Sequence, residues 1–167
     1  FFQQSTLNVE VENGVARLVQ PQSDQDSGAF WEREIQSLRN EYTRTAQLAG
    51  FGELSGPGII LRIKPLRTLE PSDLRMLVGE LFDGGARGIS VDGQRLTATS
   101  YIIGGDTGII VDGARIKTNP LVVQAIGDYE TIISAVYLLF NNIWHVTEFE
   151  IETESREKLT LPAKTLR

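Results

Sequence analysis

Two arginines at equivalent positions of an internal repeat are the side chains best placed to do chemistry. Residues 88–97 (GISVDGQRLT) recur as residues 108–117 (GIIVDGARIK), with six of ten positions identical. The planar guanidinium groups of Arg95 and Arg115 could hold a carboxylate or another anion, although an exposed hairpin arginine is more often simply solvated. The candidate ligand- or partner-binding residues are Asp92, Gln94, Arg95, Asp106, Asp112 and Arg115.

The other reactive side chains are few. The chain has no cysteine and one histidine, His145, which excludes thiol catalysis, cysteine-based zinc sites and disulfides. Asp106 or His145 could serve as an acid or base, and Ser100 or Ser134 could be a nucleophile. No nucleophile-elbow sequence supports the serines, so we predict no catalytic residue and favour a protein that is not an enzyme.

Glycine-rich and acidic motifs suggest ligand sites that their context disfavours. Residues 104–108 (GGDTG) could cradle a phosphate, but no Gly-Lys-Ser/Thr sequence leads into a helix, so the pattern predicts a plain turn. Asp92, Asp106, Asp112 and Asp128 each stand next to a glycine and could suggest a cation site. Turns recruit aspartate for local hydrogen bonds, and we therefore predict neither a metal site nor a cofactor.

Length and charge limit the partner classes. A chain of 167 residues corresponds to one domain with an appended arm and buries a sizeable core without disulfides. Its 16 basic and 22 acidic residues give a net charge of -6, which argues against nucleic acid as a partner. The longest apolar stretch, 132–140, is far too short to cross a bilayer.

The first third of the chain predicts an arm and a helix. Apolar residues alternate around Asn13-Gly14, which is typical of a hairpin, and residues 21–27 resemble a linker. From Ala29 to Ala49, apolar residues are spaced by 4, 3 and 4 in the rhythm of a coiled-coil seam: Trp31, Ile35, Leu38 and Tyr42. The helix could pack on its own domain or end a dimeric stalk. The predicted parts are an arm (1–27), a stalk-end helix (28–50) and a domain (51–167).

The remaining pattern predicts a β-α-β unit, two hairpins and a second β-α-β unit. Each Asp-Gly pair marks a two-residue hairpin turn, and Asp128 should cap a helix over 129–140, with a strand as the alternative. Ser72 should cap the first helix, and Gly84-Gly85 should end it. The predicted elements are strands at 58–63, 88–91, 121–126 and 145–152, an edge at 159–162, and helices at 72–83 and 129–140. Two helices on one face of a mixed, mainly antiparallel sheet favour a ferredoxin-like α+β sandwich.

An ordered series of motifs then suggests a family. The motifs are GPGI at 56–59, LVGEL at 77–81, GGA at 84–86, ISVDGQRL at 89–96, AIGD at 125–128 and LTLP at 159–162. At these residues the chain resembles the bacterial DUF881 family, whose biochemical function is unknown, over about Leu38 to Pro162. The resemblance implies an N-terminal membrane helix outside the present chain, a coiled-coil stalk that ends at Tyr42, and a domain outside the cytoplasmic membrane. It also implies a link to cell division.

Two functions follow as hypotheses. The first is a non-catalytic extracytoplasmic protein-interaction domain of a membrane-anchored protein, with division or envelope proteins as partners and a homodimer through the stalk helix. The second is a domain that binds or hydrolyses cell-wall fragments, with Arg95 and Arg115 as anion contacts. The second hypothesis requires both arginines and Asp106 to converge in one pocket.

Overall fold

The computed structural model describes residues 9–12, 15–18, 24–144 and 148–165. Contacts divide the chain into two units, residues 1–43 and 44–167. The first unit holds the antiparallel strands β1 (Val9–Glu12) and β2 (Val15–Leu18) and most of helix α1 (Asp24–Leu48), whose last turn belongs to the second unit. The predicted arm hairpin is confirmed in its strands, whereas its Asn13-Gly14 turn lies outside the described residues. The predicted linker is wrong from Asp24 onward, because acidic residues at a helix start favour helix.

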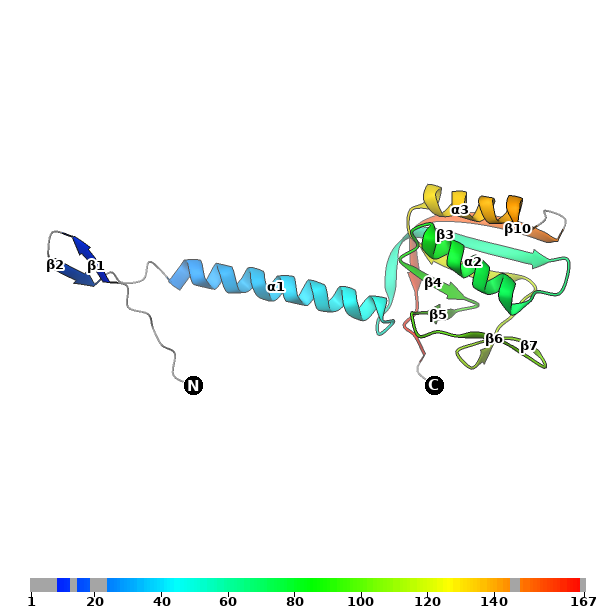
Figure 1. The fold of residues 1–167 in the computed structure, drawn as a ribbon, viewed down its shortest axis with the longest axis horizontal. Helices are drawn as coiled ribbons and strands as arrows, with labels where there is room; N and C mark the ends of the chain where they lie inside the picture. The colour runs from blue at the N-terminus through cyan, green and yellow to red at the C-terminus, as the bar shows by residue number, and fades with distance from the viewer. Residues whose placement is uncertain (1–8, 13–14, 19–23, 145–147, 166–167) are drawn as a thin grey trace. The chain divides into compact units, whose positions relative to one another are not determined.

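A five-stranded antiparallel sheet organises the second unit. Its order is β10-β3-β9-β4-β5, and α2 (Pro71–Asp83) and α3 (Tyr129–Asn142) pack on one face (Figure 1). The strands are β3 (Leu54–Pro65), β4 (Gly88–Val91), β5 (Gln94–Leu96), β9 (Leu121–Ile126) and β10 (Phe149–Leu161). Every described neighbour pair is antiparallel, so the expected mixed sheet is wrong. The α+β class with an N-terminal helix is confirmed.

Alternation along β3 explains the position of the core. Ile59, Leu61 and Ile63 are completely buried and face α2 and α3, because side chains two positions apart share a face of a strand. Ile60 points to the other face, where it joins a smaller cluster with Leu54, Ile126, Leu159 and Leu161. Each such side chain contributes about 1.5–3 kcal/mol when it is fully buried.

The helix ends partly follow the predicted caps. Asp128 Oδ1 accepts a hydrogen bond from Thr131 N at 3.0 Å, so the predicted cap of α3 is confirmed and the alternative strand is wrong. The predicted Ser72 cap of α2 is wrong: Glu70 is the N-cap and Pro71 opens the helix, a position for which its fixed φ is suited. Beyond α2, Gly85 has a left-handed φ of 87°.

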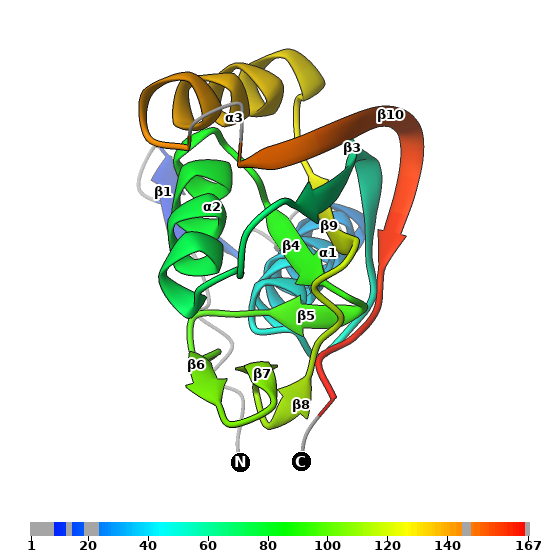
Figure 2. The same ribbon diagram turned by 90° about the vertical axis from the view of Figure 1, so that its right-hand side faces the viewer.

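Both Asp-Gly pairs form the predicted turns. Their φ angles are positive at both residues, 46° and 78° at Asp92-Gly93 and 48° and 80° at Asp112-Gly113, as the two-residue hairpin turn requires. The repeats nevertheless belong to different sheets. The first turn joins β4 to β5, and the second joins β7 (Gly108–Val111) to β8 (Ala114–Arg115) in a three-stranded sheet completed by β6 (Ile102–Gly105), drawn beyond β5 in Figure 2.

The C-terminal strand is longer than predicted. The expected strand at 145–152 and the expected edge at 159–162 are parts of one strand, β10, whose register with β3 shifts between Arg156 and Leu159. Residues 145–147, including His145, lie outside the described residues. Within the part of the chain that the structure describes, no helix combines the length and apolar character needed to cross a membrane.

Candidate functional site

The aspartates of the two Asp-Gly turns accept hydrogen bonds that connect the two hairpins. Asp92 Oδ2 accepts a hydrogen bond from Lys117 N at 2.8 Å, so the first turn holds the chain that leaves the second hairpin. Reciprocally, Asp112 accepts from Ser100 Oγ at 2.7 Å and from Tyr101 N at 3.0 Å, on the segment that leaves the first hairpin. The two hairpins therefore fasten each other, and most of the acceptor capacity of Asp112 is used within the fold.

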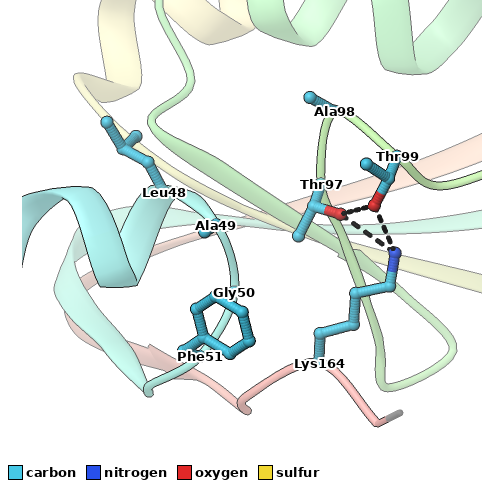
Figure 3. A pocket seen from close by; sticks show the side chains of 8 residues that line it. All are labelled: Leu48, Ala49, Gly50, Phe51, Thr97, Ala98, Thr99 and Lys164. Atoms are coloured by element: carbon cyan, nitrogen blue, oxygen red, sulfur yellow. Dashed lines mark hydrogen bonds between the residues drawn. The ribbon is translucent and has the colours of Figure 1, made fainter.

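Lys164 extends the Asp112 cluster to the C-terminal tail. Its ammonium group lies 3.3 Å from Asp112 Oδ2 and 3.1 Å from Ser100 Oγ. It also contacts the hydroxyls of Thr97 and Thr99 at 3.0 and 3.2 Å (Figure 3). The same lysine borders an open pocket of about 340 Å³ lined by Leu48, Ala49, Gly50, Phe51, Thr97, Ala98, Thr99 and Lys164. No sequence pattern signalled this cluster, because Lys164 is distant from Asp112 along the chain.

The two serines considered as nucleophiles are both occupied. Ser100 Oγ donates to Asp112 and accepts from Thr97 N at 2.9 Å and from Lys164, which uses its proton and both lone pairs. Ser134 Oγ donates to Glu130 O one helical turn earlier. These bonds give both hydroxyls local structural roles, and His145, the considered acid or base, lies outside the described residues.

The Asp112 cluster makes the free energy of unfolding depend on pH. Burial by itself would raise the pKa of Asp112, but hydrogen bonds from Ser100, Tyr101 N and Lys164 hold the pKa below its ordinary value. Because the pKa of Asp112 is lower in the folded chain than in the unfolded chain, this carboxylate stabilises the fold at any pH above its ordinary pKa. The stabilisation is lost as the pH falls through the pKa of the folded chain.

We expect Asp112→Asn to lower the free energy of unfolding by about 1.5–3 kcal/mol at pH 7. The difference from wild type should shrink steadily below about pH 4. Urea unfolding at neutral pH and near pH 3 measures both values. Asp106→Asn, at an exposed turn residue, is the control and should have little effect. A deficit of Asp112→Asn that stayed constant with pH would contradict the assignment.

Arg95 is buried, contrary to the expectation that it projects from its hairpin. The residue is 3% exposed, and Nη2 donates to Gln47 O at 3.1 Å in the last turn of α1. Its Nε and Nη1 have no partner among the described residues. Burial lowers the pKa of Arg95, and an arginine remains charged at neutral pH. The negative end of the α1 dipole partly offsets this charge.

The predicted arginine pair does not converge. Arg95 lies within the five-stranded sheet, whereas Arg115 is exposed on β8 of the other sheet. Arg115 does lie near the β6–β7 turn that carries the exposed Asp106, because a Cβ added at Gly108 would be 3.9 Å from Arg115 Nε. Gln94 is half-buried beside Arg95. The condition for an anion clamp, both arginines and Asp106 in one cavity, is therefore not met.

We expect Arg95→Met to raise the free energy of unfolding by about 1–2 kcal/mol, because it removes a buried charge with unpaired donors and keeps the side-chain volume. Chemical denaturation measures the change. Arg115→Met, at an exposed site, should stay within about 0.5 kcal/mol of wild type. A clear loss of stability in Arg95→Met would show that the bond to the Gln47 carbonyl outweighs the cost of burial.

A second charged cluster was missed in the sequence. Arg67 forms a two-point contact with Asp73 at 2.6 and 2.9 Å, its Nε lies 3.2 Å from Glu148, and its guanidinium lies 4.7 Å from the Phe149 ring centre. The Asp73 hydrogen bond is the main reason that the pKa of Arg67 is raised. The cluster joins the loop before α2 to the start of β10. It borders a cleft of about 550 Å³ lined by Pro65, Leu66, Arg67, Thr68, Leu69, Gly108, Ile109, Thr118 and Asn119.

The predicted seam on α1 is an exposed apolar row. Trp31, Ile35, Leu38 and Tyr42 are 62%, 49%, 56% and 77% exposed, and we call these four residues the α1 seam. A shallow groove runs along it, lined by Ile35, Leu38, Arg39, Tyr42 and Thr43. A row of large apolar side chains in water is unfavourable unless another surface covers it. Among the described residues, no group of three or more acidic or histidine side chains could hold a metal ion.

Comparison with known proteins gives a family and a fold. The family described as "Bacterial protein of unknown function (DUF881)" matches residues 41–167. An uncharacterised conserved protein from Mycobacterium tuberculosis has a similar structure, with a TM-score of 0.67 and 18% identity over 76% of this chain and 94% of that chain. A putative PII-like signalling protein from Thermus thermophilus matches with a TM-score of 0.33 and 12% identity, over 65% and 92% of the two chains. No curated protein matches the chain.

Proposed function

The chain belongs to the DUF881 family of bacterial proteins of unknown function, and from this premise we propose that it is a non-catalytic protein-interaction module that self-associates through α1. The observation that carries the proposal is the α1 seam. Four large apolar side chains with spacings of 4, 3 and 4 lie at least 49% exposed on a helix of 25 residues. In a coiled coil such residues take the a and d positions and are buried by a second helix.

The charges beside the α1 seam support a parallel dimer. If Ile35 and Tyr42 are a positions and Leu38 a d position, Glu34 is a g position and Arg39 is the e position of the next heptad. Parallel helices bring g of one chain to the following e of its partner, so Glu34 would face Arg39 of the second copy, twice per dimer. Antiparallel helices bring g to g, so the glutamates at 34 and 41 would face each other.

The cellular setting is the second part of the proposal. The resemblance to the family favours a membrane-anchored protein whose anchor is outside the present residues, with the α+β unit outside the cytoplasm and with division or envelope proteins as partners. Parallel α1 helices would support this arrangement, since both anchors of a dimer would then leave the coiled coil at the same end. We also propose the ferredoxin-like class, which the strand order β10-β3-β9-β4 and the two β-α-β units support.

Photo-crosslinking in cells tests the self-association. A photoreactive phenylalanine analogue at Leu38 should give a product of twice the chain mass. The same analogue at Asn40, on the opposite side of α1 from the α1 seam, should give little of it. Equal yields at both positions, or no doubled product from either, would contradict the proposal.

A further inference from the structure

The outer edge of β10 is an unpaired strand. β10 is the last strand of the sheet, and β3 is its one pairing partner among the described residues (Figure 2). From Phe149 to Ser155 the pairing with β3 runs without a bulge. Among the described residues, the backbone groups on the other side of this stretch pair with no strand. Bulges or short length protect many natural sheet edges, and this stretch has neither, so a further strand could pair with it.

A groove accompanies this edge on the helix side. It has a volume of about 280 Å³ and lies between α3 and β10, lined by Val136, Tyr137, Phe140, Asn141, Phe149, Ile151 and Thr153. The last three alternate along β10 and therefore share one face of the strand. Tyr137 and the neighbouring Leu138 are 57% and 60% exposed. Every second side chain of an added strand would point toward this apolar groove.

A row of glutamates lies on the opposite face of β10. Glu150, Glu152 and Glu154 alternate with the groove residues. Glu150 pairs with Lys64 and Glu154 with Arg62, each at 3.0 Å, and Glu154 also pairs with Arg156, whereas Glu152 has no ion pair among the described residues. The other side chains of an added strand would lie next to this row, where a basic residue is favoured by cross-strand attraction.

The same row disfavours a second copy as the occupant. Two antiparallel β10 edges paired about Glu152 would place that residue opposite itself and Glu150 opposite Glu154. Like charges directly opposite each other destabilise a strand pair. The charge pattern therefore favours a different, basic partner.

We propose that the β10 edge binds an extended segment of another protein in which apolar and basic residues alternate, by addition of a strand to the sheet. The apolar residues fill the groove beside Phe149 and Ile151, and a basic residue faces Glu152. This inference rests on the proposed function as a protein-interaction module and identifies the class of partner for the α+β unit.

A defined peptide tests the inference with the full chain. The probe is a fluorescent peptide of four Val-Lys repeats, and its binding is followed by anisotropy. We expect saturable binding, which Glu152→Lys should weaken about fivefold to tenfold, because a cross-strand attraction becomes a repulsion. Glu157→Lys, an exposed site at the register shift of β10, makes the same change in net charge and should have a much smaller effect.

A second peptide separates strand addition from adsorption of a polycation. N-methylation of alternate backbone nitrogens removes the donors that an added strand needs, so binding should be lost. Equal binding of both peptides, or equal effects of the two lysine variants, would overturn the inference. So would a dimer of the chain that pairs through the β10 edge. The molecular mass of the same samples distinguishes the two proposals. A dimer that does not bind the peptide refutes this inference alone. A monomer that binds the peptide refutes the α1 dimer alone.

Discussion

Leu38→Asp is expected to raise the dissociation constant of the proposed α1 dimer by at least about 100-fold. In a parallel dimer the two Leu38 side chains face each other, so the change removes two buried leucines worth about 1.5–3 kcal/mol each and places two carboxylates in an apolar seam. Since about 1.4 kcal/mol is a factor of ten in affinity, the loss of the two leucines alone accounts for a change of about 100-fold in the dissociation constant. Sedimentation equilibrium over a range of chain concentrations measures the constant.

Asn40→Asp is the matched control for this variant. It introduces the same charge on the outer side of α1, two residues away, where no partner helix is expected. It should leave the dissociation constant within about twofold of wild type, as for a single exposed charge. A dimer that survives Leu38→Asp would show that another surface holds the copies together.

Gly58→Ala is expected to lower the free energy of unfolding by about 3 kcal/mol or more. A Cβ at Gly58 would lie 2.3 Å from Ala125 O and 3.1 Å from Ile126 Cα, both on the backbone of β9. A backbone neighbour has no rotamer by which to move away, so β3 and β9 would have to separate locally. Urea unfolding measures the loss.

Gly79→Ala is the matched substitution in α2. A Cβ there meets nothing within 4 Å, and alanine favours helix over glycine by about 1 kcal/mol. This variant should therefore be more stable than wild type. If both variants shifted stability in the same direction, the close approach of β3 and β9 at Gly58 would not be the cause.

Local patterns predicted most of the elements of the second unit. The strands at 88–91 and 121–126 match their predicted bounds, and Asp128 caps α3 as its position implied. Both Asp-Gly turns have the expected positive φ angles. Such features depend on residues adjacent in the sequence, so a single chain suffices to predict them.

The candidate site depended on contacts between distant residues. The repeat suggested that Arg95 and Arg115 are equivalent. Whether an arginine is buried depends on which other segment packs over it: the last turn of α1 contacts Arg95, whereas Arg115 is exposed. Lys164 joins Asp112 from the C-terminal tail, and no spacing rule connects them. The Arg67–Asp73 pair was missed as well, although the bond from Glu70 N to Asp73, three positions after the N-cap, is of a kind that local sequence can signal.

The most direct test of the parallel α1 dimer is charge reversal at Glu34 and Arg39, with the dissociation constant measured by sedimentation equilibrium. Glu34→Arg and Arg39→Glu each place like charges opposite each other twice per dimer and should weaken it. The double variant restores opposite charges and should recover close to wild-type affinity. A double variant as weak as the two single effects combined would contradict a parallel pairing through the α1 seam.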